Sequence, residues 1–198
     1  NALLTRYKQN GTPDSTFGTN GVATMLTGTS TEIAKLMLQN DGKIIAVGTS
    51  RTQKPAIWVA RYNTDGSLDA TFGTGGIDTI HNTATSSDTA ITVAIQQPGG
   101  KIIVGGMTGT ALSRGGGSMT LLRLNADGLL DNTFGTNGFT VFTNNLLAGL
   151  LRDITILTDG SIITTDYRGG SNSSVRPFVK KFSANGVFDA TFNNTSQA

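Results

Sequence analysis

The sequence predicts an all-β protein made of repeated four-stranded antiparallel sheets, and three observations lead to this prediction. Four windows that align without a gap recur along the 198 residues. Short runs rich in Ile, Val and Leu, of strand length, alternate with turns that contain Gly, Asn or Asp. No stretch long enough for a helix carries a convincing apolar stripe. We therefore expect essentially no α-helix.

The repeat is clearest around four phenylalanines. The windows are RYKQNGTPDSTFGTNG from Arg6, RYNTDGSLDATFGTGG from Arg61, RLNADGLLDNTFGTNG from Arg123 and KFSANGVFDATFNNTS from Lys181. Their phenylalanines lie 55 to 62 residues apart and are Phe17, Phe72, Phe134 and Phe192. A second set of windows, NDGKIIAVG, PGGKIIVGG and TDGSIITTD, precedes the last three phenylalanines. A fixed period of this length is typical of repeat architectures.

Each period contains four predicted strands, A to D. In strand A of one copy, Ile91, Val93 and Ile95 share one face by period-two alternation. An Asp-Gly or Gly-Gly turn leads to strand B, which predicts a two-residue hairpin with positive φ. Strand C reads WVARY, LLRL or FVKKF, and a turn of the form N-x-D-G follows it. A compact connection ending in F-G-T-x-G then leads to strand D.

Four consecutive antiparallel strands at this period predict a β-propeller blade rather than a solenoid rung. A two-sheet sandwich is the structural alternative, but it does not require so regular a repeat. The predicted repeats span approximately residues 1–27, 28–81, 82–143 and 144–198. The first holds only strands C and D, and the last lacks its own strand D. The chain is thus predicted to contribute about three blades to a single propeller domain or to part of one.

The motifs resemble a known family. The pairing of D-G-K-I-I-x-x-G with R-Y-N-x-D-G-x-L-D-x-T-F-G-T-x-G resembles the bacterial delta-60 repeat, an uncharacterised β-propeller repeat of large surface or secreted proteins. The resemblance covers nearly the whole chain and implies a secreted or cell-surface setting. It implies no catalytic residues. The last copy departs from the pattern, with Lys181 in place of Arg and Asn193 in place of Gly.

Composition excludes several classes of function. The chain has no Cys, which rules out disulfides, zinc-thiolate sites and a cysteine nucleophile. Its formal net charge is +2 and no basic block occurs, so nucleic acid is not an expected partner. No apolar run approaches the roughly 20 residues of a membrane-spanning helix. We expect no cofactor.

The N-x-D-G-x-x-D segments suggest calcium only superficially. A calcium loop of the EF-hand kind needs a distant bidentate Glu, and the chain has a single glutamate, Glu32. Turns built on Asp-Gly or Asn-Gly explain all four copies without metal. The glycine-rich run at residues 114–118 is predicted to connect two strands, so it lacks the helix N-terminus that a phosphate loop requires.

A basic residue and an aspartate recur at a constant offset of eight. The pairs are Arg6 and Asp14, Arg61 and Asp69, Arg123 and Asp131, and Lys181 and Asp189. Because a feature present in every repeat usually serves the repeat, we predict that these pairs hold the connection after strand C through bidentate hydrogen bonds. We interpret the four phenylalanines as core plugs between blades.

No catalytic constellation emerges from the sequence. His81 is the only histidine and lies between Asp78 and Asp88, but no G-x-S-x-G elbow supplies a nucleophile. A glycosidase needs two facing carboxylates. The candidates outside the repeat motifs are Glu32, Asp78, Asp88, Asp153 and Asp166, and no spacing pairs them. Enzymatic activity is therefore left open, with a non-enzymatic role favoured.

The candidate binding surface consists of the variable connections between strands B and C and between strands D and A. These connections emerge on one face of the predicted ring, and function commonly resides on loops held by a rigid scaffold. The candidate residues are Arg51, Lys54, His81, Asp88, Arg114, Tyr167, Arg168 and Asn172.

The leading hypothesis is a non-enzymatic extracytoplasmic module with a structural or protein-interaction role. A carbohydrate-binding or carbohydrate-active propeller that uses the variable face is the alternative. Expected partners are a second copy or other propeller segments of the same protein, with a glycan or an anionic protein surface as further candidates. Open blades at both ends also predict completion by strand addition, with residues 22–26 of one copy completing the blade at residues 176–182 of another.

Overall fold

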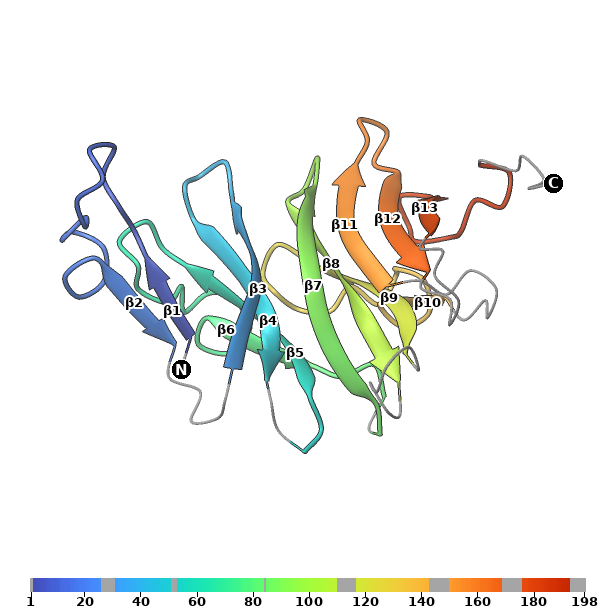
Figure 1. The fold of residues 1–198 in the computed structure, drawn as a ribbon, viewed down its shortest axis with the longest axis horizontal. Helices are drawn as coiled ribbons and strands as arrows, with labels where there is room; N and C mark the ends of the chain where they lie inside the picture. Colours follow the sequence, from blue (N-terminus) through green and yellow to red (C-terminus); the bar gives the residue numbers. More distant parts are fainter. Residues whose placement is uncertain are drawn as a thin grey trace.

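The protein forms four antiparallel sheets that follow one another along the chain (Figure 1). The computed structural model describes residues 2–25, 31–50, 53–83, 85–109, 117–142, 150–168 and 176–192. These residues contain thirteen strands and no helix. None of them belongs to a helix that is long and apolar enough to cross a membrane. The predicted all-β class is confirmed.

Each sheet is built from strands that are consecutive in sequence. Sheet 1 contains β1 (Ala2–Thr5) and β2 (Val22–Met25). Sheet 2 contains β3 (Thr31–Leu38), β4 (Ile44–Ser50), β5 (Ala56–Tyr62) and β6 (Ile77–Ile80). Sheet 3 contains β7 (Ser87–Gln96), β8 (Lys101–Gly109), β9 (Ser118–Leu124) and β10 (Phe139–Phe142). Sheet 4 contains β11 (Leu150–Ile156), β12 (Ile162–Arg168) and β13 (Arg176–Phe182).

The first strands of sheets 2, 3 and 4 lie next to one another, because β7 packs against both β3 and β11. Each of these strands carries a register shift near its middle, between Ile33 and Lys35 in β3 and between Ala90 and Thr92 in β7. Such a bulge bends the strand and increases its twist. The hairpin turns that follow β3, β7 and β11 all project toward the same edge of the molecule, at the top of Figure 1.

The turn between β3 and β4 differs from the predicted two-residue hairpin. The Gly42 N–H donates to the Gln39 carbonyl at 2.9 Å, and the Gln39 N–H donates to the Lys43 carbonyl at 2.8 Å. Gly42 has a φ of 83°, whereas Asp41 does not have a positive φ. The connection is therefore a longer loop closed by one left-handed glycine, an arrangement also available to an Asp-Gly sequence.

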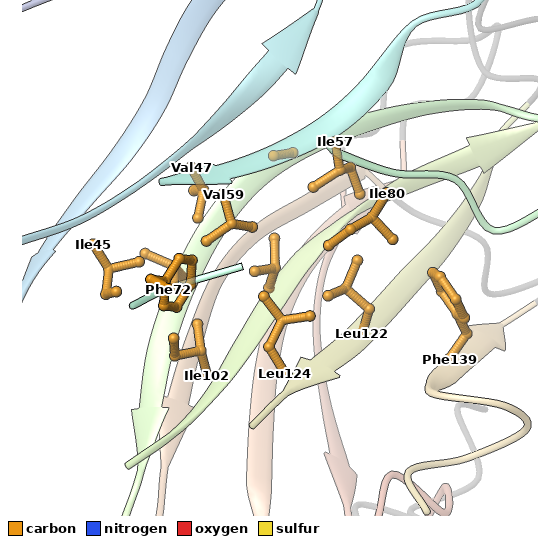
Figure 2. Packing of buried hydrophobic residues seen from close by; sticks show 13 residues of the cluster. Ile45, Val47, Ile57, Val59, Phe72, Ile80, Ile102, Leu122, Leu124 and Phe139 are labelled. Atoms are coloured by element: carbon orange, nitrogen blue, oxygen red, sulfur yellow. The ribbon is translucent and has the colours of Figure 1, made fainter. Parts of the chain in front are cut away.

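Three apolar clusters fill the spaces between successive sheets. One joins sheets 1 and 2, one joins sheets 2 and 3, and one joins sheets 3 and 4. Figure 2 shows the middle cluster, in which Val59 and Phe72 of the second repeat meet Ile102 and Leu124 of the third. Because each cluster takes its side chains from two sheets, neither sheet buries its apolar face alone.

The prediction that the four phenylalanines are core plugs is correct for three of them. Phe17, Phe72 and Phe134 are fully buried. Phe192 is 39% exposed, so the prediction is wrong at this position. The three buried rings are covered by a turn of the following sheet, and the described residues contain no sheet after sheet 4 that would supply such a turn.

Candidate functional site

The Arg and Asp pairs of sheets 1, 2 and 3 form compact polar clusters at one end of each of these sheets. Lys181 and Asp189 of sheet 4 are described but are not joined by a hydrogen bond or an ion pair, so the prediction is wrong for this pair. In sheet 2, Arg61 Nε donates to Asp69 Oδ2 at 2.7 Å, and Lys43 Nζ donates to the same oxygen at 2.7 Å. The other carboxylate oxygen accepts hydrogen bonds from the Thr71 backbone N–H at 3.1 Å and the Thr71 hydroxyl at 2.6 Å. Both oxygens of a buried carboxylate are thus satisfied by protein donors.

These contacts hold the aspartates in the charged form. Hydrogen bonds from Lys43 and Thr71, together with the Arg61 charge, lower the pKa of Asp69 well below its usual range. Burial raises the pKa of Asp131, but hydrogen bonds from Lys101 and Thr133 and the Arg123 charge outweigh it, and the net shift is downward. Hydrogen bonding to the ionised form and a nearby opposite charge both favour ionisation. The two carboxylates are therefore poor candidates for general acid–base chemistry near neutral pH.

The clusters of sheets 1, 2 and 3 also bind the next sheet along the chain. The Arg61 guanidinium lies 4.7 Å from the centre of the Phe72 ring, and its Nη1 donates to the Ala126 carbonyl of sheet 3 at 2.6 Å. The Gly73 N–H donates to the Asp127 carbonyl at 2.8 Å. Gly128, with a φ of 91°, lies so close to Phe72 that a Cβ there would be 2.8 Å from the ring.

We call this cluster a clasp, defined by the basic residue, Asp, Thr and Phe of one sheet. Clasp 2 contains Arg61, Asp69, Thr71 and Phe72, and clasp 3 contains Arg123, Asp131, Thr133 and Phe134. Clasp 1 contains Arg6, Asp14, Thr16 and Phe17, and clasp 4 contains Lys181, Asp189, Thr191 and Phe192.

Clasps 1 and 3 repeat the geometry of clasp 2. In clasp 3, Arg123 Nη1 donates to the Ala184 carbonyl at 2.7 Å, and the Gly135 N–H donates to the Asn185 carbonyl at 2.9 Å. In clasp 1, Arg6 Nη1 donates to the Thr64 carbonyl. The clasp therefore joins sheet 1 to sheet 2, sheet 2 to sheet 3 and sheet 3 to sheet 4.

The sequence predicted the Arg and Asp partners of the clasp. The predicted bidentate geometry is wrong, because each arginine donates a single hydrogen bond to its aspartate, from Nε. Two further parts of the clasp were missed. Lys43 and Lys101 each donate to the clasp aspartate, the latter to Asp131 at 2.6 Å. The signal was the Lys in the D-G-K-I-I and G-G-K-I-I windows, which lies at the start of strand B in both complete sheets and is replaced by Ser161 in the last copy. The backbone carbonyls that accept from the arginines carry no residue-type signal.

The N-x-D-G segments form turns, as the sequence predicts. The Gly66 N–H donates to the Asn63 carbonyl at 3.0 Å, and Gly66 has a φ of 86°. Asp65 Oδ1 accepts from the Ser67 backbone N–H at 2.9 Å and from its hydroxyl at 2.6 Å. Within the described part of the chain, no group of three or more His, Cys, Asp or Glu side chains is placed to hold a metal ion.

Comparison with known proteins identifies the repeated sheets. Two segments, residues 39–72 and 97–134, match the family model described as "Domain of unknown function (DUF5122) beta-propeller". The sheets are β-propeller blades. Each matched segment runs from the hairpin turn before strand B to the phenylalanine of the clasp, so the match covers the elements that build clasps 2 and 3. No curated protein matches the chain.

The structure describes only part of the predicted binding face of the propeller. Arg51, Arg114 and Asn172 lie outside the described residues. The backbones of Tyr167 and Arg168 belong to the end of β12. Lys54 is exposed in the connection between β4 and β5, and His81 is exposed after β6. A binding role for these residues stays a prediction.

Asp88 is the second residue of β7 and is buried rather than exposed at the rim of the binding face. Its side chain is buried, and its Oδ2 accepts hydrogen bonds from the Ser86 hydroxyl at 2.6 Å and the Asn82 N–H at 3.1 Å. His81 Nδ1 lies 3.5 Å from the same oxygen. The structure thus brings His81 and Asp88 together, and one oxygen of the Asp88 carboxylate holds the connection from β6 to β7.

Two other candidate carboxylates, Asp153 and Asp166, have separate side-chain partners. Asp153 in β11 accepts from the Thr92 hydroxyl of β7 at 2.7 Å and lies 3.6 Å from Lys35 of β3. Asp166 is buried and paired with Lys180, and burial raises the pKa of its carboxyl group. Asp153 and Asp166 therefore each have a structural contact that joins strands.

Proposed function

We propose that this chain is a non-enzymatic, extracytoplasmic propeller module with a structural or protein-interaction role. The proposal rests on the contacts that the repeated charged residues make. Arg6, Arg61 and Arg123 each engage an aspartate of their own blade and a backbone carbonyl of the next. These charged groups make contacts between blades, which supports a structural role for the repeat.

The extracytoplasmic part of the proposal rests on the resemblance to repeats of bacterial surface and secreted proteins. It is tested by treating intact cells that express the tagged protein with a protease that does not enter them. Loss of the intact tagged protein supports an external location, and full protection until lysis contradicts it. A tagged cytoplasmic protein in the same cells controls for leakage.

The non-enzymatic part is tested with a panel of glycosidase substrates and a glycan array. We expect neither turnover nor selective binding by the purified chain. Turnover would contradict the non-enzymatic proposal directly. Selective glycan binding that is lost in Arg114→Ala, Tyr167→Ala and Arg168→Ala would favour the carbohydrate-binding alternative instead, with Leu129→Ala on a turn of blade 3 as the control.

A further inference from the structure

The two end faces of the molecule are the counterparts of faces that are buried inside it. On sheet 4, Val179 occupies the position held by Val59 in sheet 2 and Leu121 in sheet 3. The two internal residues are fully buried, whereas Val179 is 41% exposed. Phe192 is 39% exposed, whereas its counterparts Phe72 and Phe134 are fully buried. Val179 and Phe192 both belong to the surface that would meet a following blade. We call this surface the tail face, consisting of Ile163, Val179, Phe192 and the rest of clasp 4.

Sheet 1 presents the complementary side. Leu3 and Tyr7 occupy the positions of Trp58 and Tyr62 in sheet 2, which are buried against sheet 1. Leu3 is 59% exposed and Tyr7 is 62% exposed. Together with the turn at residues 8–11 they form the head face. Since alternate residues of a strand face opposite sides, Leu4 packs toward sheet 2 while Leu3 faces away from it.

The turn on the head face has the geometry of the turns that close the clasps. Gly66, Gly128 and Gly186 have φ values of 81° to 91° and lie against Phe17, Phe72 and Phe134. Gly11 has the same backbone conformation, with a φ of 80°, and a Cβ there would meet nothing within 4 Å. The turn is thus preformed and uncovered.

Exposure alone does not define the head face and the tail face. Val187 is 65% exposed, but its counterpart Leu129 in the fully flanked sheet 3 is 55% exposed as well. Val187 is therefore outside the contact surface in every blade. Leu3, Tyr7, Val179 and Phe192 differ because their internal counterparts are buried.

We propose that the tail face of one copy of this chain binds the head face of a second copy, so that the turn at residues 8–11 closes clasp 4. In this complex the Lys181 ammonium donates to the Gln9 carbonyl, as Arg61 does to the Ala126 carbonyl, and Gly11 lies over Phe192. The inference names a partner for the interaction module and in that sense rests on the proposed function. It leaves the pairing of β1 with β2 intact, in contrast to completion of a blade by residues 22–26.

Because the two faces differ, the interface is heterologous and each copy keeps one free face after a single contact. This property provides a sharp test with two surface variants. Val179→Glu places a charge on the tail face, and Tyr7→Glu places one on the head face. Leu129→Glu is the matched control, since the exposure of Leu129 lies between those of Val179 and Tyr7 and Leu129 lies outside both faces.

Sedimentation velocity of the full chain over a range of concentrations measures the outcome. We expect the wild type and Leu129→Glu to associate, and each face variant alone to sediment as a monomer. An equimolar mixture of the two face variants should restore a dimer and nothing larger, because only one intact head and one intact tail remain.

A wild-type chain that stays monomeric up to its solubility limit would overturn the proposal, as would variants that associate like the wild type or a mixture that stays monomeric. Thermal unfolding by circular dichroism, at a concentration where the wild type is monomeric and with the transition unchanged by each substitution, shows that the variants are folded. A glycosidase or selective glycan result would overturn the proposed function without changing these sedimentation outcomes.

Discussion

Clasps 3 and 4 have related sequences but different surroundings. In clasp 3, Arg123, Asp131 and Phe134 are buried, and residues 184–186 of the next blade cover them. In clasp 4, Phe192 is exposed, and Lys181 replaces the arginine. The residues of the clasp motif are therefore not buried by the motif itself. Its contribution to stability depends on the turn of the following blade.

The largest difference is expected at the phenylalanines. Phe134→Ala should lower the free energy of unfolding by about 3–5 kcal/mol, because it removes a fully buried aromatic side chain. Phe192→Ala should cost about 1 kcal/mol or less at concentrations where the chain is monomeric. Urea denaturation of both variants checks this. Equal losses would show that clasp 4 is as well packed as clasp 3.

Substitution of Asp131 and of Asp189 should also lower the free energy of unfolding by different amounts. Asp131→Asn leaves Arg123 buried without its charged partner, and breaking such a pair costs about 3–5 kcal/mol. Asp189→Asn should have a much smaller effect, since that carboxylate is more exposed. The measurement is again urea denaturation, and a larger loss at Asp189 would contradict the account.

Two glycine substitutions distinguish the cost of backbone strain from the cost of losing close contact between a turn and the ring that it covers. Gly128→Ala and Gly11→Ala both place a Cβ at a positive φ, which costs roughly 1–2 kcal/mol. Only Gly128 also faces the Phe72 ring, so we expect a further loss of about 1–3 kcal/mol from overpacking there. Thermal unfolding of the two variants tests the difference. Equal destabilisation would mean that the turn does not need close contact with the ring.

The smallest effect is expected for the dependence of the unfolding free energy on pH in acid. The folded pKa values of Asp69 and Asp131 lie below the unfolded value of about 3.9. Their stabilising contribution is complete above that value and is lost as the pH falls toward the folded pKa values. Asp166, whose pKa is raised, acts in the opposite direction. The unfolding free energy should fall below about pH 4, and Asp131→Asn should make this dependence shallower than in the wild type or Asp189→Asn.

A large part of the fold could be predicted from the sequence, for physical reasons that are visible in particular residues. The alternation in residues 91–95 and the gap-free repeat around Phe17, Phe72 and Phe134 determine strands and blades, because side-chain patterning reports burial. The offset of eight between Arg61 and Asp69 predicts their contact, since both flank one compact connection.

The remaining features depend on tertiary placement. The burial of Asp88 follows from the path of the connection between β6 and β7, which its residue types do not specify. The hairpin at Gly42 was predicted with the wrong length because Asp-Gly fits both kinds of turn. The exposure of Phe192 depends on whether a blade covers it, and its own motif is nearly the same as that of Phe134.

The most direct test of the clasp is the hydrogen exchange of the glycine amides that cross between blades. The N–H groups of Gly18, Gly73 and Gly135 donate to carbonyls of the next blade at 2.7 to 2.9 Å. If the clasps hold the blades together, these amides exchange only through cooperative unfolding and are as protected as the central strands β4 and β8. Asp131→Asn should then lower the protection of Gly135 more than that of Gly18. Fast exchange of all three amides in the folded wild type would contradict the account.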